Sequence, residues 1–233
     1  MKIQGSTVLV TGANRGLGLA FAKALLAAGA RKVYAGARDP ASVTLPGVVP
    51  VKLDVTNAQD IAAAAALAGD VDIVINNAGI IGDVPLLDAQ NGDAGLRRVM
   101  ETNLYGIHAM SVAFAPVLKK NGGGALVNML SALSWLSLEN TAAYSVSKAA
   151  AWALTNGLRN ELRAQGTQVL GIHAGYIDTD MVSAVDAPKS SPADIAARTL
   201  EALERGDSEV LADEAAKRVK AGFNATPAAY LGG

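Results

Sequence analysis

The chain carries a tyrosine and a lysine four positions apart in the segment YSVSK, residues 144–148. Positions i and i+4 lie on one face of an α-helix, so the ammonium group of Lys148 can stand near the phenol of Tyr144. A free phenol has a pKa near 10, and a nearby cation is expected to lower this pKa toward the working pH. A phenol tuned in this way can act as a general acid or base. By itself, however, such a pair is more often a packed tyrosine and a solvated lysine.

A glycine-rich segment near the N-terminus, VLVTGANRGLG, runs from an apolar strand pattern into a helical pattern. Gly12 permits a tight turn, Gly16 lets the backbone approach a pyrophosphate group, and Gly18 lets the helix pack on the strand. The N-terminus of that helix offers free N–H groups and a partial positive charge to phosphates. Because a strand precedes the glycines and a helix follows them, the segment favours a dinucleotide site over a simple turn.

The end of the second strand, VYAGARD, bears on which nicotinamide dinucleotide is bound. An acidic side chain at this strand tip would hydrogen-bond the ribose 2′-hydroxyl of NAD. Ala37 occupies that position, Arg38 follows it, and Arg15 of the glycine segment can reach the same corner. Two guanidinium groups suit a 2′-phosphate, so NADP(H) is the expected cofactor. Asp39 is the counter-evidence, because a shifted register brings it to the ribose and leaves NAD(H) possible.

These motifs need a scaffold of alternating strands and helices. The strand segments are almost wholly apolar, which is expected when both faces of a parallel sheet are covered. The predicted fold class is therefore α/β: a Rossmann-type, doubly wound sheet of about seven mainly parallel strands with helices on both faces. Strands are predicted at Thr7–Val10, Lys32–Gly36, Val48–Leu53, Ile73–Ile75, Ala125–Leu130, Gln168–His173 and Glu209–Leu211. Helices are predicted at Gly16–Ala28, Ala58–Leu67, Asp93–Lys119, Ala142–Ala164, Pro192–Glu204 and Glu214–Ala221.

Composition narrows the class of protein further. The 233 residues fit one catalytic domain spanning 1–233, and a net charge of −1 without charge blocks argues against a nucleic-acid partner. The lack of cysteine excludes disulfides and thiolate catalysis. His108 and His173 have no motif-spaced partners, so no metal site is expected. No segment has the ~20 apolar residues of a membrane helix, and no signal peptide is visible, so a cytoplasmic protein is expected.

In this order the motifs closely resemble the short-chain dehydrogenase/reductase family, in its compact branch with a TGxxxGxG loop and a YxxxK pair. The resemblance extends from Thr11 to about Met181, and Tyr144 follows Ser131 by 13 residues, the separation usual in the family. The matching segments are TGANRGLG (11–18), LDVT (53–56), NNAG (76–79), NLYG (103–106), Ser131, YSVSK (144–148) and AGYIDTDM (174–181).

The resemblance implies a catalytic tetrad. Tyr144 would be the general acid or base, Ser131 would hydrogen-bond the substrate oxygen, and Lys148 would also hold the nicotinamide ribose. Asn103 looks like the residue that supports a water-linked proton relay to the lysine. The expected cofactor contacts are Gly12, Asn14, Arg15, Gly16, Leu17, Gly18, Arg38, Asp54, Val55, Asn77, Ala78, Gly79, Tyr144, Lys148, Gly175, Ile177 and Thr179.

One departure from the family pattern lies beside the expected substrate site. Ala174 stands where the family usually has a proline before Gly175, and losing that φ restraint is expected to loosen the loop. A short substrate loop, about residues 180–191, implies an accessible pocket. No arginine or lysine is obviously placed for an anionic substrate, so a neutral, apolar ketone or alcohol is expected. Pocket candidates, each equally compatible with core packing, are Leu133, Trp135, Ile80, Tyr176 and Met181.

The sequence therefore predicts an NADPH-dependent enzyme that reduces ketones or aldehydes and is reversible as an alcohol dehydrogenase. A non-catalytic NADP(H)-sensing module is the alternative, although the intact tetrad argues against it. An epimerase or dehydratase is disfavoured because the chain is too short. The resemblance also implies a homodimer or homotetramer through helices 93–119 and 142–164. Core packing alone could also explain the apolar surfaces of these helices.

Overall fold

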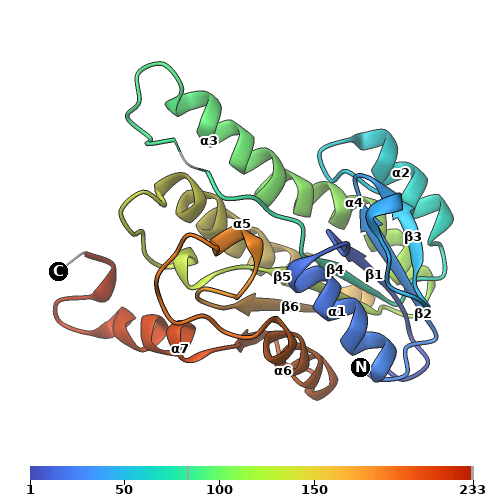
Figure 1. Ribbon diagram of the computed structural model, residues 1–233. Helices are drawn as coiled ribbons and strands as arrows, with labels where there is room; N and C mark the ends of the chain where they lie inside the picture. The colour runs from blue at the N-terminus through green and yellow to red at the C-terminus, as the bar shows by residue number, and fades with distance from the viewer. Residues whose placement is uncertain (83, 232–233) are drawn as a thin grey trace.

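A computed structural model describes residues 1–82 and 84–231. Seven strands form one parallel sheet in the order β3-β2-β1-β4-β5-β6-β7 (Figure 1). The order reverses between β1 and β4, and ligands of such sheets bind beyond the carboxyl ends of the strands at this switch point. The strands are β1 Thr7–Thr11, β2 Lys32–Ala37, β3 Val49–Lys52, β4 Ile73–Asn76, β5 Ala125–Met129, β6 Gln168–His173 and β7 Glu209–Leu211.

Helices cover both faces of the sheet (Figure 1). The α-helices are α1 Gly16–Ala27, α2 Ala58–Leu67, α3 Gly92–Met100, α4 Gly106–Lys120, α5 Ala142–Glu161, α6 Pro192–Arg205 and α7 Glu214–Ala221. The 3₁₀ turns are η1 Pro40–Ser42, η3 Ala132–Ser134, η4 Arg163–Gln165, η5 Asp180–Val182, η6 Gly222–Asn224 and η7 Ala229–Leu231, while η2, Glu101–Tyr105, is a π-helical turn. These segments confirm the predicted fold class.

Alternate residues of each central strand pack into two separate hydrophobic cores, one on each face of the sheet. In β1, Val8 and Val10 pack with α1 and α6, whereas Leu9 between them packs with α2, α4 and α5. The same division occurs in β4, where Ile73 and Val74 belong to opposite cores. Successive side chains of a strand point to opposite faces, so a continuous apolar run is required to bury both sides. This is why the strands show no polar alternation.

The predicted element boundaries are mostly correct to within one or two residues, but the predicted single helix Asp93–Lys119 is wrong in detail. The helical path begins at Gly92, passes through the π turn Glu101–Tyr105 and continues as α4. The predicted helix Ala142–Ala164 also ends early, because α5 stops at Glu161 and the 3₁₀ turn η4 follows. A π turn inserts one extra residue into the helix and is frequent at functional sites.

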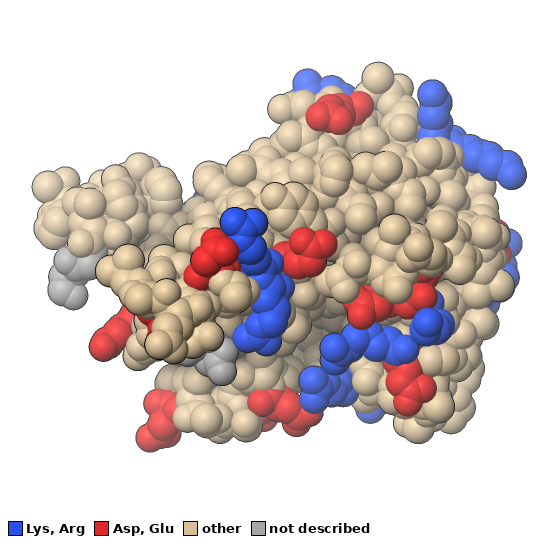
Figure 2. Space-filling view, turned by 90° about the horizontal axis from the view of Figure 1, so that it is seen from above, with Lys and Arg blue, Asp and Glu red and all other residues tan. Residues whose placement is uncertain are grey.

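The surface carries charges of both signs. Figure 2 shows lysine and arginine side chains lying beside aspartate and glutamate on the face seen from above, with wide uncharged areas between them. Among the described helices, none has both the length and the apolar character required to cross a membrane.

Candidate active site

Tyr144 and Lys148 lie in the first two turns of α5, on the face that meets the carboxyl end of β5. Lys148 is 3% exposed, and its Nζ atom donates a hydrogen bond to the carbonyl oxygen of Met129 at 2.7 Å. The same nitrogen lies 5.6 Å from the centre of the Tyr144 ring. The structure therefore brings phenol and ammonium together as the helical spacing predicts.

The predicted direction of the Tyr144 pKa shift is wrong for this structure. Burial raises the pKa of the Tyr144 phenol to about 12, and a hydrogen bond to the Ser131 side chain only partly opposes that rise. Burial also lowers the pKa of Lys148 to about 8. The expectation of a lowered pKa rested on the attraction between phenolate and ammonium alone. Removal from water favours the neutral form of each group, and burial is the largest effect on both pKa values.

Ser131 follows β5 and begins the 3₁₀ turn η3. Its hydroxyl accepts a hydrogen bond from the Leu133 N–H at 3.1 Å, and its N–H donates to the Ser134 hydroxyl at 3.3 Å. This capping arrangement holds Ser131 beside Tyr144 with 6% of its surface exposed. A hydroxyl fixed next to the phenol can hydrogen-bond the same substrate oxygen that receives the phenol's proton.

Asn103 lies within the π turn and is fully buried. Its Oδ1 atom accepts from the Ile80 N–H at 2.9 Å, while Nδ2 donates to the Ile80 carbonyl at 2.9 Å and to the Ser147 hydroxyl at 3.0 Å. A Cβ atom at Gly79 would lie 3.2 Å from Asn103 Oδ1 and 3.8 Å from Lys148 Nζ. The amide therefore links the loop after β4 to α5, and Gly79 keeps the space between them open.

The glycine loop forms a cradle suited to phosphates. Gly12 and Gly16 have φ values of +65° and +53°, and a Cβ atom at Gly18 would fall 2.0 Å from the Gly12 carbonyl oxygen. Helix α1 has no side-chain cap and no acidic residue in its first turn. Its first N–H groups, with the helix dipole behind them, therefore fit a pyrophosphate. Asn14 and Leu17 lie in this segment, half-buried and buried respectively.

Thr11 and Asn77 brace this cradle. The Thr11 hydroxyl accepts from the N–H groups of Asn77 and Ala78 at 3.0 and 2.9 Å. The Asn77 side chain donates back to the carbonyl groups of Thr11 and Gly12 at 2.9 and 3.3 Å. Thr11 was not among the predicted site residues, although its place at the start of the TGANRGLG segment was a signal for it.

At the tip of β2, Ala37 is buried while Arg38 and Asp39 are exposed. The Asp39 carboxylate caps η1 by accepting from the Ala41 N–H at 3.0 Å. Burial acts to raise the pKa of the Asp54 carboxyl group, but the hydrogen bonds from Thr56 and the nearby charge of Arg38 together leave this pKa lowered. Arg15 pairs with Asp180 across the exposed edge of the cradle at 3.3 Å. At this corner Arg38 therefore lies near Asp54, while Asp39 is occupied as a cap and Arg15 is paired with Asp180.

The remaining predicted cofactor contacts surround the same strand ends. Asp54 accepts from the N–H and hydroxyl of Thr56 at 2.9 and 2.8 Å, which fixes the turn that carries Val55. On the other side of the cradle, a Cβ atom at Gly16 would lie 3.2 Å from the Thr179 methyl carbon. Gly175, Ile177 and Thr179 are half-buried on the loop that leaves β6. The glycine loop and the loop after β6 thus approach each other directly.

The predicted pocket residues divide into two groups. Leu133, Tyr176 and Ile80 are half-buried and Met181 is 50% exposed, all on loops beyond the strand ends. Trp135 is only 8% exposed and packs behind the site, stacked on His173 with ring centres 3.9 Å apart and with Lys220 over its ring. The structure therefore assigns Trp135 to the support of the Ser131 turn, the core-packing alternative.

His173 is a second supporting residue that the sequence did not connect to the site. Its Nδ1 atom lies 2.9 Å from the Ser131 carbonyl oxygen, and because a carbonyl only accepts, Nδ1 carries the proton. The ring is fully buried, and burial lowers its pKa to about 4. Within residues 1–82 and 84–231, no cluster of three or more His, Asp or Glu residues suits a metal ion.

Comparison with known proteins agrees with this geometry. The family model described as short chain dehydrogenase matches residues 6–190, and the chain belongs to this family of oxidoreductases. A crystal structure of a short chain dehydrogenase from Burkholderia cenocepacia J2315 in complex with NADP is similar over 98% of this chain and 97% of its own, with 42% identity and a TM-score of 0.93.

Two further relatives show the breadth of the family. The 3-oxoacyl-[acyl-carrier-protein] reductase FabG of Vibrio cholerae is 31% identical over 195 residues, covering 80% of this chain and 79% of its own. Short chain dehydrogenase tazN of Aspergillus terreus is 34% identical over 204 residues. That match covers 80% of this chain and spans 44% of the length of the fungal protein.

Proposed function

We propose that this chain is an NADP(H)-dependent carbonyl reductase, reversible as an alcohol dehydrogenase, that acts on neutral apolar ketones or aldehydes. The observation that carries the proposal is the joint position of Ser131, Tyr144 and Lys148 beside the glycine cradle. Gly79 lies against Lys148 and Asn103, so the proton-handling groups and the expected nicotinamide position share one space. The bound nicotinamide would supply or accept the hydride, which the side chains themselves cannot do.

The chain's own residues would manage the proton. Because the Tyr144 phenol has a pKa of about 12, it is protonated at neutral pH and can give its proton to the oxygen of a carbonyl as that carbonyl is reduced. Ser131 would hold that oxygen. Lys148, fixed by the Met129 carbonyl, would supply a positive charge beside the phenol and two further N–H donors for ribose hydroxyls.

Preference for NADP(H) is supported by the corner at the tip of β2. Arg38 is exposed there without an acidic residue at position 37, and Asp39 is turned into the η1 cap. The similar Burkholderia cenocepacia enzyme was crystallised with NADP. An arginine can bind a 2′-phosphate through two parallel hydrogen bonds, whereas NAD has only a hydroxyl there. NAD(H) remains a possible, weaker cofactor.

An apolar substrate is supported by the loops that follow β4, β5 and β6. Each loop exposes large apolar side chains beyond the carboxyl edge of the sheet. Exposed apolar side chains of this kind favour contact with apolar ligands. They are Ile81, Leu86, Leu87, Leu138 and Met181.

The experiment that tests the proposal is NADPH oxidation with a panel of neutral aryl and alkyl ketones, compared with ketoacids. The Tyr144→Phe variant should lose kcat by about 10²–10⁴-fold, the usual contribution of a general acid. Its Kd for NADPH should change by less than about threefold, because the phenyl ring keeps the packing. NADPH binding without turnover of any ketone in the native protein would favour the sensing module instead.

We expect residues 1–233 to act as one catalytic domain, since β6 and β7 belong to the same sheet as the strands of the glycine cradle. A homodimer or homotetramer through helices 93–119 and 142–164 is supported by exposed apolar side chains on these helices, among them Tyr105, Val112 and Val146. The cytoplasmic location stays a prediction.

A further inference from the structure

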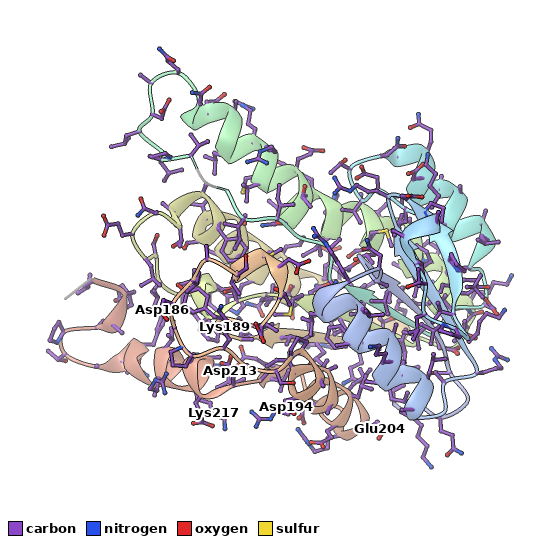
Figure 3. All side chains as sticks on the ribbon, in the orientation of Figure 1. Asp186, Lys189, Asp194, Glu204, Asp213 and Lys217 are labelled. Atoms are coloured by element: carbon purple, nitrogen blue, oxygen red, sulfur yellow. The ribbon has the colours of Figure 1, made fainter. Side chains whose placement is uncertain are left out.

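We propose that Asp213 is a positioning residue that holds both ends of the loop between β6 and α6, residues 174–191, which contains the substrate loop. Asp213 lies between β7 and α7 and is 5% exposed. Its Oδ2 atom accepts from the Gly175 N–H at 2.8 Å and from the Ser190 hydroxyl at 3.0 Å. Its Oδ1 atom caps α7 by accepting from the Ala216 N–H at 2.8 Å. Figure 3 shows Asp213 close to the loop that carries Asp186 and Lys189.

The two residues bound by Oδ2 lie at opposite ends of that loop. Between them, Ser190 donates its N–H to the Tyr176 carbonyl at 2.8 Å, and Asp178 donates to the Ser190 carbonyl at 2.9 Å. Ile177 and Ser190 therefore pair as a short parallel bridge. Residues 179–189 extend from this closed base, which the Asp213 carboxylate and the backbone bridge hold together.

Gly175 fits tightly against the start of α7. A Cβ atom at Gly175 would lie 2.6 Å from the Ala215 methyl carbon. On the other side of the same loop, the Ala174 carbonyl accepts from the Ala132 N–H at 2.9 Å, next to Ser131. The loop is thereby held from both sides, which offsets the loosening expected from the missing proline at position 174. Asp213 supplies by hydrogen bonds the restraint that a proline ring would supply covalently.

A carboxylate is the side chain suited to this task. Ionised aspartate offers two oxygens with about four acceptor positions and no donor, so it satisfies all three N–H and O–H groups. Asparagine would keep one acceptor oxygen and turn an NH₂ group toward at least one of these donors. Ser190→Ala removes only the bond to the far end of the loop and leaves the α7 cap intact. Comparing the two variants therefore distinguishes an effect on the loop from an effect on the cap of α7.

Limited trypsin digestion of the full chain tests the proposal without any assay of activity. The loop contains one trypsin site, the bond after Lys189, which adjoins Ser190. Loss of a buried hydrogen bond to a charged group is expected to speed this cleavage about tenfold in Asp213→Asn and less in Ser190→Ala. Cleavage after the exposed Lys120 on α4 serves as the internal reference. Asp194→Asn, the same chemical change at an exposed site, is the matched control.

A second readout links the loop to the cofactor and rests on the proposed function. Since Ile177 and Thr179 extend from the base that Asp213 holds, Ser190→Ala should raise the Kd for NADPH several-fold while kcat with a ketone falls less. NADPH should also slow the cleavage after Lys189 in the native chain. Equal acceleration after Lys189 and Lys120 in both variants would overturn the proposal, because Asp213 would then support the fold as a whole. Selective loop cleavage without any ketone turnover would keep this inference and reject the proposed reaction.

Discussion

The Nζ atom of Lys148 lies 5.6 Å from the centre of the Tyr144 ring and donates to the Met129 carbonyl. Burial raises the pKa of the phenol to about 12 and lowers that of the ammonium to about 8. Both pKa shifts thus favour the neutral form of the group concerned. Near neutral pH the phenol keeps its proton, as carbonyl reduction requires, while the lysine is close to the pH at which its charge is lost.

The pH dependence of reduction should follow Lys148. Its pKa is lowered from 10.5 to about 8, so its positive charge is present below that pH and disappears as the pH rises through it. Tyr144 still holds its proton in this range, because its pKa is about 12. We expect kcat/KM for reduction of an uncharged ketone to fall above about pH 8. The measurement is the pH profile between pH 6 and 10.

A suitable control for this profile is Lys32→Met. Lys32 pairs with Asp70 near the amino end of β2, at the edge of the sheet opposite the candidate site. The control should reproduce the native profile. A native profile that stays flat to pH 9.5 would show that the charge of Lys148 does not limit the reaction.

Cofactor preference should depend on Arg38. Replacing Arg38 by aspartate removes a donor for the 2′-phosphate and adds repulsion against it, whereas the 2′-hydroxyl of NAD can donate to the new carboxylate. We expect kcat/KM for NADPH to fall about 10–100-fold relative to that for NADH. Both cofactors should be titrated at saturating ketone. Arg163→Asp, the same change at an exposed residue on η4, should leave the ratio unaltered, and a similar ratio in Arg38→Asp would reject the assigned corner.

Local patterns predicted much of the scaffold. The strand β6, Gln168–His173, and the helix α2, Ala58–Leu67, coincide with their predicted bounds. Both are signalled by residues adjacent in sequence: a continuous apolar run for the strand, and an alanine-rich segment for the helix, which Asn57 caps in the structure. The π turn at Asn103 was not predictable in this way. A helix with one inserted residue has the same composition and nearly the same periodicity as a regular helix.

Properties that depend on the tertiary environment could not be predicted from the sequence. The i,i+4 spacing correctly predicted that Lys148 stands near Tyr144, but the sign of the phenol's pKa shift depends on how much water the fold removes. Asp213 looks like an ordinary helix cap because Glu214 and Ala215 follow it. Its two other partners, Gly175 and Ser190, lie 38 and 23 positions earlier in the chain and reach it only through the β6–β7 pairing.

Oligomer formation should be sensitive to Val112, a residue of α4 that is 61% exposed. A glutamate there would place a charge in the proposed contact between subunits, which disfavours burial. We expect Val112→Glu to shift the native species toward a smaller mass in light scattering coupled to size-exclusion chromatography. Leu67→Glu, at a 58% exposed apolar residue on α2, is the matched control and should keep the native mass. An unchanged mass in Val112→Glu would show that this face of α4 is not part of the contact between subunits.

Acid stability should depend on His173, which is fully buried and has its pKa lowered from 6.5 to about 4. Burial is the main cause, and Lys220, Lys148 and Arg159 add repulsion, while the Ser131 carbonyl opposes the shift. Between pH 6.5 and 4 the unfolded chain binds a proton that the folded chain does not. This histidine's share of the free energy of unfolding is therefore fully present above pH 6.5 and is lost toward pH 4.

The magnitude can be tested with His173→Asn, whose Nδ2 group can still donate toward the Ser131 carbonyl but does not titrate. A difference of this size in pKa corresponds to at most about 3 kcal/mol, and the nearby Glu209 carboxylate, 3.5 Å from Nε2, would reduce it by stabilising the protonated ring. Urea unfolding at pH 7 and pH 4.5 should therefore show the native protein losing more stability than the variant. His108→Gln, at an exposed histidine, should lose as much as the native protein. Equal losses in the native protein and His173→Asn would contradict the prediction, because they would mean that the ring binds its proton over the same pH range in the folded and unfolded chains.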